Sequence, residues 1–440
     1  MLKRTVNKLE PPQILILVFA VAILLGSFLL VLPIASNEAI SYMDALFTAT
    51  SAMTVTGLVV VDAGTAFTLF GQIVIIALIQ LGGLGIMTFA VLIYMALGKK
   101  IGIRQRILMK QALNQSAIGG VVALAKKLLF FSLSVEIVAI IFLSIRWVPE
   151  LGWSDGLYTS VFHAVSAFNN AGFSIWSDSL SGYVFDPVIN ILITLLFIIG
   201  GIGFTVVFDL WSKKEFKHLS LHTKVMLFGT LLINLFSMLI IFVLEYNNPD
   251  TLGVMSSSQK LAAAYFQAVT PRTAGFNTID IASMEESSLF YIITLMFIGG
   301  GSASTAGGIK LTTALAILLS TMAVFKSKEN IVLFQRNLRP YTIMRALALT
   351  VGSMAVVILT IFILNLTEDA SFLTIMFESV SAFGTVGLSM GLTGELTTVG
   401  KVVLVLTMLV GKLGPLTFAF AFTSHTPDLI KYPKEDVMTG

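Results

Sequence analysis

Four copies of one short segment recur along the chain and constrain its architecture more than any other feature. Each copy begins with phenylalanine, continues through small and hydroxyl-bearing residues, and ends at a glycine followed by leucine or phenylalanine. The copies cover residues 47–58, 162–173, 266–276 and 377–388. Their closing glycines are Gly57, Gly172, Gly275 and Gly387, which lie 115, 103 and 112 residues apart. Internal repeats of this kind predict four similar structural units.

Composition shows which environment these units occupy. Hydrophobic residues make up 56% of the 440, charged residues only 12%, and mean hydropathy is +0.93. A soluble protein carries about 25% charged residues, and an apolar run of about 20 residues can span a bilayer. Such runs recur here, so we expect a polytopic membrane protein whose first span is residues 14–32 rather than a cleaved signal peptide. The absence of cysteine excludes disulfides and thiolate metal sites.

Each repeat is expected to contain a membrane span, a short helix that leads into the loop, and a second span. The predicted units are residues 1–110, 111–218, 219–335 and 336–440. First spans are expected near residues 14–33, 128–145, 225–244 and 346–366. Second spans are expected near 69–98, 187–208 and 402–423, and the second span of repeat three is expected to be broken.

Charge is distributed unequally between the two sides of these spans. The segments that join the repeats are rich in lysine and arginine, whereas the opposite side carries most of the aspartate and glutamate. The positive-inside rule then places both termini in the cytoplasm of a multi-pass cell-membrane protein. Two spans per repeat give all repeats one orientation, whereas inverted repeats need an odd number of spans. The expected fold is all-α, with four parallel span–pore-loop–span repeats in pseudo-fourfold symmetry around one central pore.

The four loops are candidates for a selectivity filter that binds a dehydrated cation. Irregular backbone at membrane depth is tolerated where it is buried in protein or lines a watery cavity, and glycine permits close approach of four chains. Backbone carbonyls there can replace the hydration shell of a cation. Ordinary small-residue helix packing is the alternative. The candidate filter residues are Thr54, Val55, Thr56, Gly57, Asn169, Asn170, Ala171, Gly172, Thr273, Ala274, Gly275, Gly384, Thr385, Val386 and Gly387.

Polar residues accompany the loops. After its leading phenylalanine each copy has a polar side chain, expected to tie the short helix to neighbouring backbone: Thr48, His163, Gln267 and Glu378. Arg272 lies within the third copy. Because a guanidinium facing a cation pathway would repel the ion, we expect Arg272 to face away and pair with an acid on the outer side.

On these loops and on the glycine-rich stretch of repeat three, the chain resembles the membrane subunit of the Ktr potassium-uptake systems, within the Trk/Ktr/HKT superfamily. The resemblance covers essentially the whole length. It implies K⁺ as the transported ion and a homodimer in which each subunit has its own pore, gated by a cytosolic ring of subunits that bind ATP or ADP. Membrane lipid is the other expected partner. No nucleic acid, covalent cofactor or enzymatic activity is expected, and modulation by Na⁺ stays open.

Glycine clusters interrupt every second span, at residues 82–85, 200–203, 299–302 and 411–414. Helix packing accounts for the first two. In repeat three the 39 residues between Glu286 and Lys326 would form a helix of about 58 Å, against a hydrocarbon core of about 30 Å. We expect a break that forms a mobile gating loop beneath the filter, with an ordinary kink as the alternative. The candidate residues are Gly299, Gly300, Gly301, Ser302, Ala303, Ser304, Thr305, Ala306, Gly307, Gly308 and Lys310.

Two lysines fall inside second spans, where a charge costs about 2.5–3.5 kcal/mol on insertion scales. Lys412 is expected to donate to carbonyls of the gating loop, and the resembled family more often has arginine there. Lysine offers a single ammonium group in place of the planar guanidinium of arginine, so the loop contact implied by the resemblance is less certain to be the same here. For Lys310, snorkelling to water is as good a reading as a contact with the loop.

Two other functions are alternatives to a channel. An intramembrane serine hydrolase would use Ser302 or Ser304 in the glycine-rich break, yet none of the four histidines is placed to activate them. A cation-coupled secondary transporter is the nearer alternative to a channel. If the regulatory ring exists, we expect it to dock on the basic segments 99–127 and 326–345, the second of which follows an expected helix at 311–325.

Overall fold

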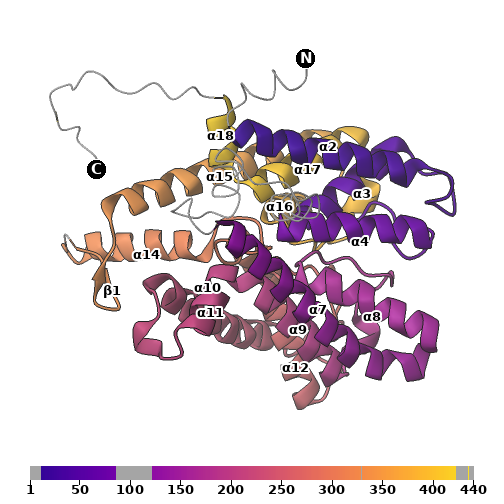
Figure 1. Cartoon of the computed structure of the whole chain (residues 1–440), viewed down its shortest axis with the longest axis horizontal. Helices are drawn as coiled ribbons and strands as arrows, with labels where there is room; N and C mark the ends of the chain where they lie inside the picture. The colour runs from indigo at the N-terminus through magenta and orange to yellow at the C-terminus, as the bar shows by residue number, and fades with distance from the viewer. Residues whose placement is uncertain (1–10, 86–120, 329, 423–434, 436–440) are drawn as a thin grey trace.

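The computed structural model describes residues 11–85, 121–328, 330–422 and 435. Within them, helices form nearly all regular structure, as the long uncharged runs predict (Figure 1). Repeats one and two contain α2 (Pro11–Val31), α3 (Tyr42–Thr54), α4 (Leu69–Leu84), α7 (Val121–Leu151), α8 (Trp153–Phe168), η1 (Ser181–Tyr183), α9 (Pro187–Ile202), α10 (Phe204–Ser212) and η2 (Phe216–His218). Repeats three and four contain α11 (Leu221–Glu245), α12 (Ser257–Val269), α13 (Glu286–Phe297), α14 (Leu311–Phe325), β1 (Val332–Leu333), β2 (Arg336–Asn337), α15 (Pro340–Thr367), α16 (Phe372–Gly384), η3 (Leu392–Glu395), α17 (Thr398–Leu413) and α18 (Pro415–Phe422).

Four described helices are long and apolar enough to cross a membrane, namely α2, α7, α11 and α15, the first span of each repeat. Only 22–33% of their most apolar stretches is buried inside the protein, as expected of helices that face lipid. The short helices α3, α8, α12 and α16 differ, because nearly all of their C-terminal halves is buried. The first spans therefore enclose the short helices that carry the repeated motif.

Two second spans are bent rather than continuous, which corrects the spans expected at 187–208 and 402–423. The axes of α9 and α10 meet at 90° at Gly203, and those of α17 and α18 meet at 95° at Gly414. Both glycines have positive φ (107° and 85°), where a side chain is disfavoured. Pro415 begins α18, where its missing N–H costs nothing. Helix α4 also ends at a positive-φ glycine, Gly85, after which residues 86–120 lie outside the described part.

The break predicted in repeat three is confirmed. Helix α13 ends at Phe297 and α14 begins at Leu311. Between them the chain folds back on itself, because Gly299 N–H donates to the Ile309 carbonyl at 2.8 Å and Leu311 N–H donates to that of Gly300 at 3.0 Å. We call residues 298–310 the inner loop.

The ends of the chain close the arrangement. Helix α3 of repeat one packs against α17 of repeat four, and α2 packs against α18, so the indigo and yellow parts of Figure 1 lie together. On the opposite side of the view are α7, α8, α9, α11 and α12. Lys401 Nζ and Asp44 Oδ1 form an ion pair of 2.7 Å across the boundary between repeats four and one.

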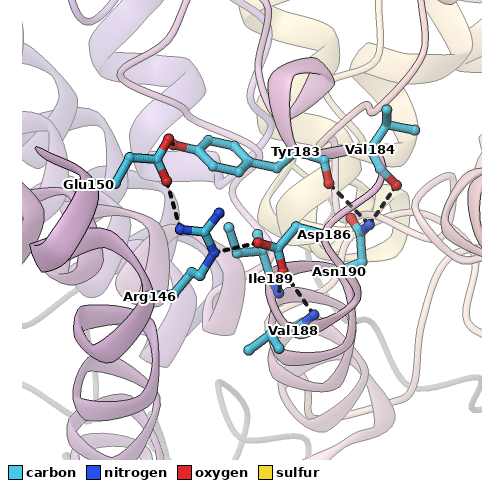
Figure 2. Close-up of polar contacts among 8 residues, drawn as sticks. All are labelled: Arg146, Glu150, Tyr183, Val184, Asp186, Val188, Ile189 and Asn190. Carbon is cyan, nitrogen blue, oxygen red and sulfur yellow. Dashed lines mark hydrogen bonds and ion pairs between the residues drawn. The ribbon is translucent and has the colours of Figure 1, made fainter.

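A polar cluster fixes one end of repeat two (Figure 2). Asp186 caps α9 by accepting from Val188 N–H, and its other carboxylate oxygen pairs with Arg146 Nε at 2.6 Å. Arg146 Nη1 also binds Glu150 at 2.8 Å, and Glu150 accepts from the Tyr183 hydroxyl. Burial raises the pKa of Tyr183 to about 12, so the phenol remains a donor at neutral pH. The cluster thereby locks α7 to the start of α9.

Candidate functional site

The four repeated loops share an uncommon backbone conformation. The residue two positions before each closing glycine has positive φ although none is glycine: Val55 (51°), Asn170 (57°), Thr273 (74°) and Thr385 (50°). The closing glycines also have positive φ, between 67° and 92°. Left-handed backbone costs an ordinary residue about 1–2 kcal/mol, and such strain concentrates at functional sites. Its fourfold recurrence marks these loops as a candidate site.

Buried hydroxyl groups hold each loop in this conformation. Ser51 Oγ accepts from Gly57 N–H at 3.1 Å, and Ser381 Oγ accepts from Gly387 N–H at 3.2 Å. The corresponding residues in the other copies donate instead to a carbonyl just after the glycine: Ser166 to Phe173 and Thr270 to Phe276. These four hydroxyls were not among the residues predicted from the sequence, although one stands five or six positions before every closing glycine.

The four closing glycines lie against one another in cyclic order. A Cβ built on any of them would be in close contact or collision with the carbonyl oxygen of the residue that precedes the glycine of the next repeat, and the Cβ on Gly172 would collide with Gly275 itself. The residues met are Ala171 for Gly57, Ala274 for Gly172, Val386 for Gly275 and Thr56 for Gly387. Since the fourth contact returns to repeat one, the four loops close into a ring, which we call the glycine ring.

The glycine ring lies at an outer cavity of about 330 Å³ that all four closing glycines line, together with Asp62 and Asp280. A second cavity, of about 310 Å³, is lined by the inner loop and the glycine clusters of α4 and α17. The glycines of those clusters accommodate the motif helices, because a Cβ at Gly82 or Gly411 would collide with the carbonyl of Met53 or Phe383. The packing role expected for the first cluster is thereby supported.

The inner loop contacts the glycine-ring segments of two repeats. Thr305 Oγ1 donates to Asn170 Oδ1 at 2.8 Å, and Gly307 lies so close to Thr385 that a Cβ on it would overlap the threonine side chain. Backbone hydrogen bonds anchor the loop to the bend between α9 and α10: Gly301 N–H to the Gly201 carbonyl (2.7 Å), Thr305 N–H to that of Gly200 (3.3 Å), and Phe204 N–H to that of Ala303 (2.9 Å).

Both intramembrane lysines donate to carbonyls of the inner loop. Lys412 Nζ donates to Thr305, so the contact suggested by the sequence is present. Lys310 Nζ donates to Ala306 at 2.6 Å and to Gly307 at 3.3 Å, which favours the loop contact over snorkelling. Both side chains line the second cavity. The Nζ groups of two lysines therefore bind carbonyl oxygens of the inner loop.

The polar residues that follow each leading phenylalanine behave differently from the expectation. Glu378 accepts from the hydroxyls of Ser389 and Thr393, which follow the loop, and also from the backbone N–H of Thr393. His163 contacts the Thr159 carbonyl of its own helix and the Ser174 hydroxyl. Among described residues, Thr48 Oγ1 and both amide atoms of Gln267 have no partner. The expected bond to neighbouring backbone is therefore present for Glu378 and absent for Thr48 and Gln267, whereas His163 bonds to the backbone of its own helix.

The expectation for Arg272 is correct in the direction of the side chain and wrong in its partner. Its side chain faces α11, away from the glycine ring, and it is only 8% exposed. Its partner is the Asn234 amide oxygen at 3.2 Å, not an outer acid, and no carboxylate in the described part forms an ion pair with it. The sequence could not show this, because Asn234 lies within an apolar span with no acid near its level.

Glu136 is a further functional candidate that was not predicted from the sequence. This glutamate of α7 is 3% exposed, and both of its carboxylate oxygens accept from Gln80 Nε2 of α4, at 3.0 and 3.1 Å. One also accepts from Asn169 Nδ2 at 3.3 Å, and Asn169 is one of the candidate filter residues. A lone acid inside an apolar span is the signal that could have found it. Asn169 therefore faces back into a polar cluster rather than toward the ring.

We expect Glu136→Gln to reduce discrimination between K⁺ and Na⁺. A glutamine there must direct its amide N–H₂ at the amide groups of Gln80 or Asn169, so a buried hydrogen bond worth about 1–3 kcal/mol is lost. That corresponds to about fivefold or more in ion discrimination, measured by competition between the two ions in uptake assays. Glu150→Gln, on the same helix but 41% exposed, is the matched control. Equal discrimination in both variants would contradict the role given to Glu136.

The serine-hydrolase alternative is not supported by the described residues. Ser304 Oγ donates to the Gly301 carbonyl, and the buried His163 contacts Ser174 instead of either candidate serine. Among the described residues, no group of three or more histidine, cysteine, aspartate or glutamate side chains could hold a metal ion.

Comparison with known proteins shows the family to which the chain belongs. The family described as TrkH, cation transport protein, matches residues 9–430. The "Ktr system potassium uptake protein B" of Bacillus subtilis is 56% identical, over 98% of this chain and 97% of its own, and the protein of the same name from Vibrio alginolyticus is 44% identical over 100% and 97%. The "Potassium/sodium uptake protein NtpJ" of Enterococcus hirae is 38% identical over 100% and 99%.

A solved structure supports the fold. The potassium transporter TrkH from Vibrio parahaemolyticus superposes with a TM-score of 0.75, covering 93% of this chain and 83% of that one, at 23% sequence identity. The resemblance drawn from the four loops is thereby confirmed at the level of the family, which is one of transporters and not of enzymes. This multi-pass membrane protein belongs to the TrkH family of cation transport proteins.

Proposed function

We propose that the chain takes up K⁺ selectively across the cell membrane through a channel-like pore, the axis of which passes through the glycine ring. The observation that carries the proposal is the cyclic contact of Gly57, Gly172, Gly275 and Gly387 at the outer cavity. Four parallel repeats around one axis are the simplest arrangement that gives such a ring. The filter is then formed by the backbone carbonyls of the fifteen candidate residues.

The electrostatics of the site favour a cation without a ring of acids at the filter. The motif helices α3, α8, α12 and α16 end three to six residues before the closing glycines, so their C-terminal ends approach the ring. Each such end carries roughly half a negative charge. Asp62 and Asp280 add negative charge at the outer cavity, where they raise the local cation concentration. Carbonyl dipoles can then replace the hydration shell.

The inner loop is proposed to be the gate. It lies against Thr385 and Asn170 of the ring segments on one side and lines the second cavity on the other. Its central residues form few hydrogen bonds with one another, and it is held mainly by Lys412 and by the bend at Gly203. An element held mainly by contacts to other segments can adopt a second arrangement at modest cost when those contacts change.

Two relatives are named as proteins of a Ktr system, so partner subunits are part of the proposal. We propose a homodimer, both termini in the cytoplasm, and a cytosolic nucleotide-binding ring that controls the gate. Helix α14 leads from the inner loop into the hairpin β1–β2, near which Arg336, Arg339 and Arg345 form a basic segment. A partner docked there can act on the loop through α14. The other proposed docking segment, 99–127, lies mostly outside the described residues.

Flux through the purified subunit is expected to respond to nucleotide only in the presence of the ring. The reason is mechanical, because α14 connects the basic segment directly to the inner loop. The measurement is co-purification with the ring of a Ktr system, followed by ⁸⁶Rb⁺ uptake into liposomes with ATP and with ADP. Identical uptake with and without the ring in both nucleotides would refute the coupling and leave the pore untouched.

A cation-coupled secondary transporter remains the alternative, and one relative is named for both potassium and sodium. A pore predicts K⁺ flux that follows the K⁺ gradient and membrane potential without a second ion. A coupled mechanism predicts that an opposing Na⁺ or proton gradient drives K⁺ uphill. Uphill ⁸⁶Rb⁺ accumulation at zero potential would favour the transporter.

A further inference from the structure

A small cavity with both polar and apolar walls lies behind the third loop, between α9, α11 and the inner loop. Its volume is about 20 Å³, and its lining includes Arg272, Asn234, Thr230, Gly201 and Gly300. A polar cavity of about 10–15 Å³ can already hold a water molecule, so there is room for one small ion. The cavity is distinct from the two cavities on either side of the glycine ring.

Two polar groups at this cavity lack partners. Arg272 Nε and Thr230 Oγ1 are buried and make no hydrogen bond within the described residues, although both side chains line the cavity and are each 8% exposed. A buried donor without a partner destabilises the folded protein, and more so when the group is charged. Both groups are thus available to a ligand in the cavity.

The available groups favour an anion. A guanidinium is only a donor, and a threonine hydroxyl can donate. Asn234 Oδ1, the acceptor closest to the guanidinium, is already used by Arg272 Nη1. A cation would meet the full charge of Arg272. A water molecule would satisfy donors but would leave that charge without a counter-ion, and buried charges in proteins are normally paired.

We propose that Arg272, Thr230 and Asn234 form a binding site for one small monovalent anion of the halide class. The anion accepts hydrogen bonds from Arg272 and from Thr230, and it supplies the negative charge that no described carboxylate provides. Its size is limited by the cavity, which excludes carboxylates as large as gluconate.

The site explains how an arginine can stand three residues before Gly275. A bare positive charge beside the ring would oppose a cation there, whereas an arginine–anion pair is neutral overall. This consequence rests on the proposed pore. The site itself does not, because it is defined by the cavity and its donors.

The test is the thermal unfolding of the full-length protein in lipid nanodiscs at constant K⁺ and ionic strength, with bromide replacing gluconate stepwise. We expect a saturable rise in the unfolding temperature for wild type. Thr230→Val should raise the half-saturating bromide concentration by about tenfold or more, because a hydrogen bond to an anion is lost. Arg272→Gln should abolish the bromide effect. Thr350→Val removes a hydroxyl that is equally unpartnered but lies on α15, outside the cavity, and should leave the response unchanged.

Anomalous scattering from crystals grown in bromide adds a direct measurement, with one peak expected between Arg272 and Thr230. The proposal is overturned if wild type unfolds at the same temperature in bromide and gluconate, or if Thr230→Val responds to bromide as Thr350→Val does. It is also overturned if the bromide-grown crystals show no peak in the cavity, since water alone then fills it. Neither measurement requires ion transport, so their failure is separate from failure of the pore.

Discussion

Replacing Gly275 with alanine is expected to abolish most of the discrimination between K⁺ and Na⁺ while leaving the protein in the membrane. A methyl group there collides with the Val386 carbonyl of the next repeat, and the backbone has φ of 76°, which disfavours any side chain. The collision must displace a carbonyl that the filter uses. A loss of about 2 kcal/mol in preferential K⁺ binding would reduce selectivity by about thirtyfold. The measurement is competitive uptake of ⁸⁶Rb⁺ and ²²Na⁺.

The control is Gly152→Ala, which separates crowding from backbone strain. Gly152 also has positive φ (87°), but a Cβ on it would meet no atom within 4 Å, and it lies at the start of α8. This variant should transport with the wild-type preference. The account of the filter fails if Gly275→Ala keeps that preference too, or if both variants lose it equally.

Deleting residues 302–306 is expected to increase K⁺ flux and to remove its dependence on a regulatory subunit. The deletion removes the Thr305 groups that bind Asn170 and Lys412, but retains the hydrogen bonds of Gly299 to Ile309 and of Gly301 to Gly201. An obstruction that contributes about 1.4 kcal/mol to the barrier lowers the rate about tenfold, and this is the gain expected. Initial rates of ⁸⁶Rb⁺ uptake into liposomes measure it.

Lys412→Gln provides a milder version of the same experiment. The neutral amide can still donate to Thr305, so the chain keeps a hydrogen bond while losing the charge that strengthens it. We expect an intermediate increase in flux. A correctly folded deletion variant that transports more slowly than wild type would show that the inner loop is part of the conduction path instead of its gate.

The sequence predicted most of the fold because the four motif copies are independent signals of one structure. It also placed the break in repeat three, since a run of 39 residues with Lys310 as its one charge is too long to form one span. The bends at Gly203 and Gly414 were not predicted. A glycine cluster in an apolar run fits close helix packing as well as it fits a bend, and only the positive φ distinguishes the two. The filter and the gate stay predictions, supported by position and contacts.

Side-chain pairing was less predictable than the backbone. The contact of Lys412 with the inner loop followed from the cost of a charge in an apolar span. The same argument failed for Arg272, because its partner is an amide within another span and not an acid near the surface. The cost of a buried charge also applies to Glu136 of α7, but its partners could not be predicted. They are Gln80 on α4 and Asn169 at the end of α8. Pairs between spans depend on helix rotation, which apolar periodicity specifies poorly when both faces are hydrophobic.

The central claim is that four glycine-ended loops form a K⁺-selective pore. It is tested most directly by parallel uptake of ⁸⁶Rb⁺ and ²²Na⁺ into liposomes that contain only the purified wild-type chain, each driven by its own gradient. The account predicts Rb⁺ uptake that K⁺ competes away and a much smaller Na⁺ uptake. Equal entry of both ions through the wild-type chain would contradict it. So would the absence of any entry of either ion through a folded variant that lacks residues 302–306.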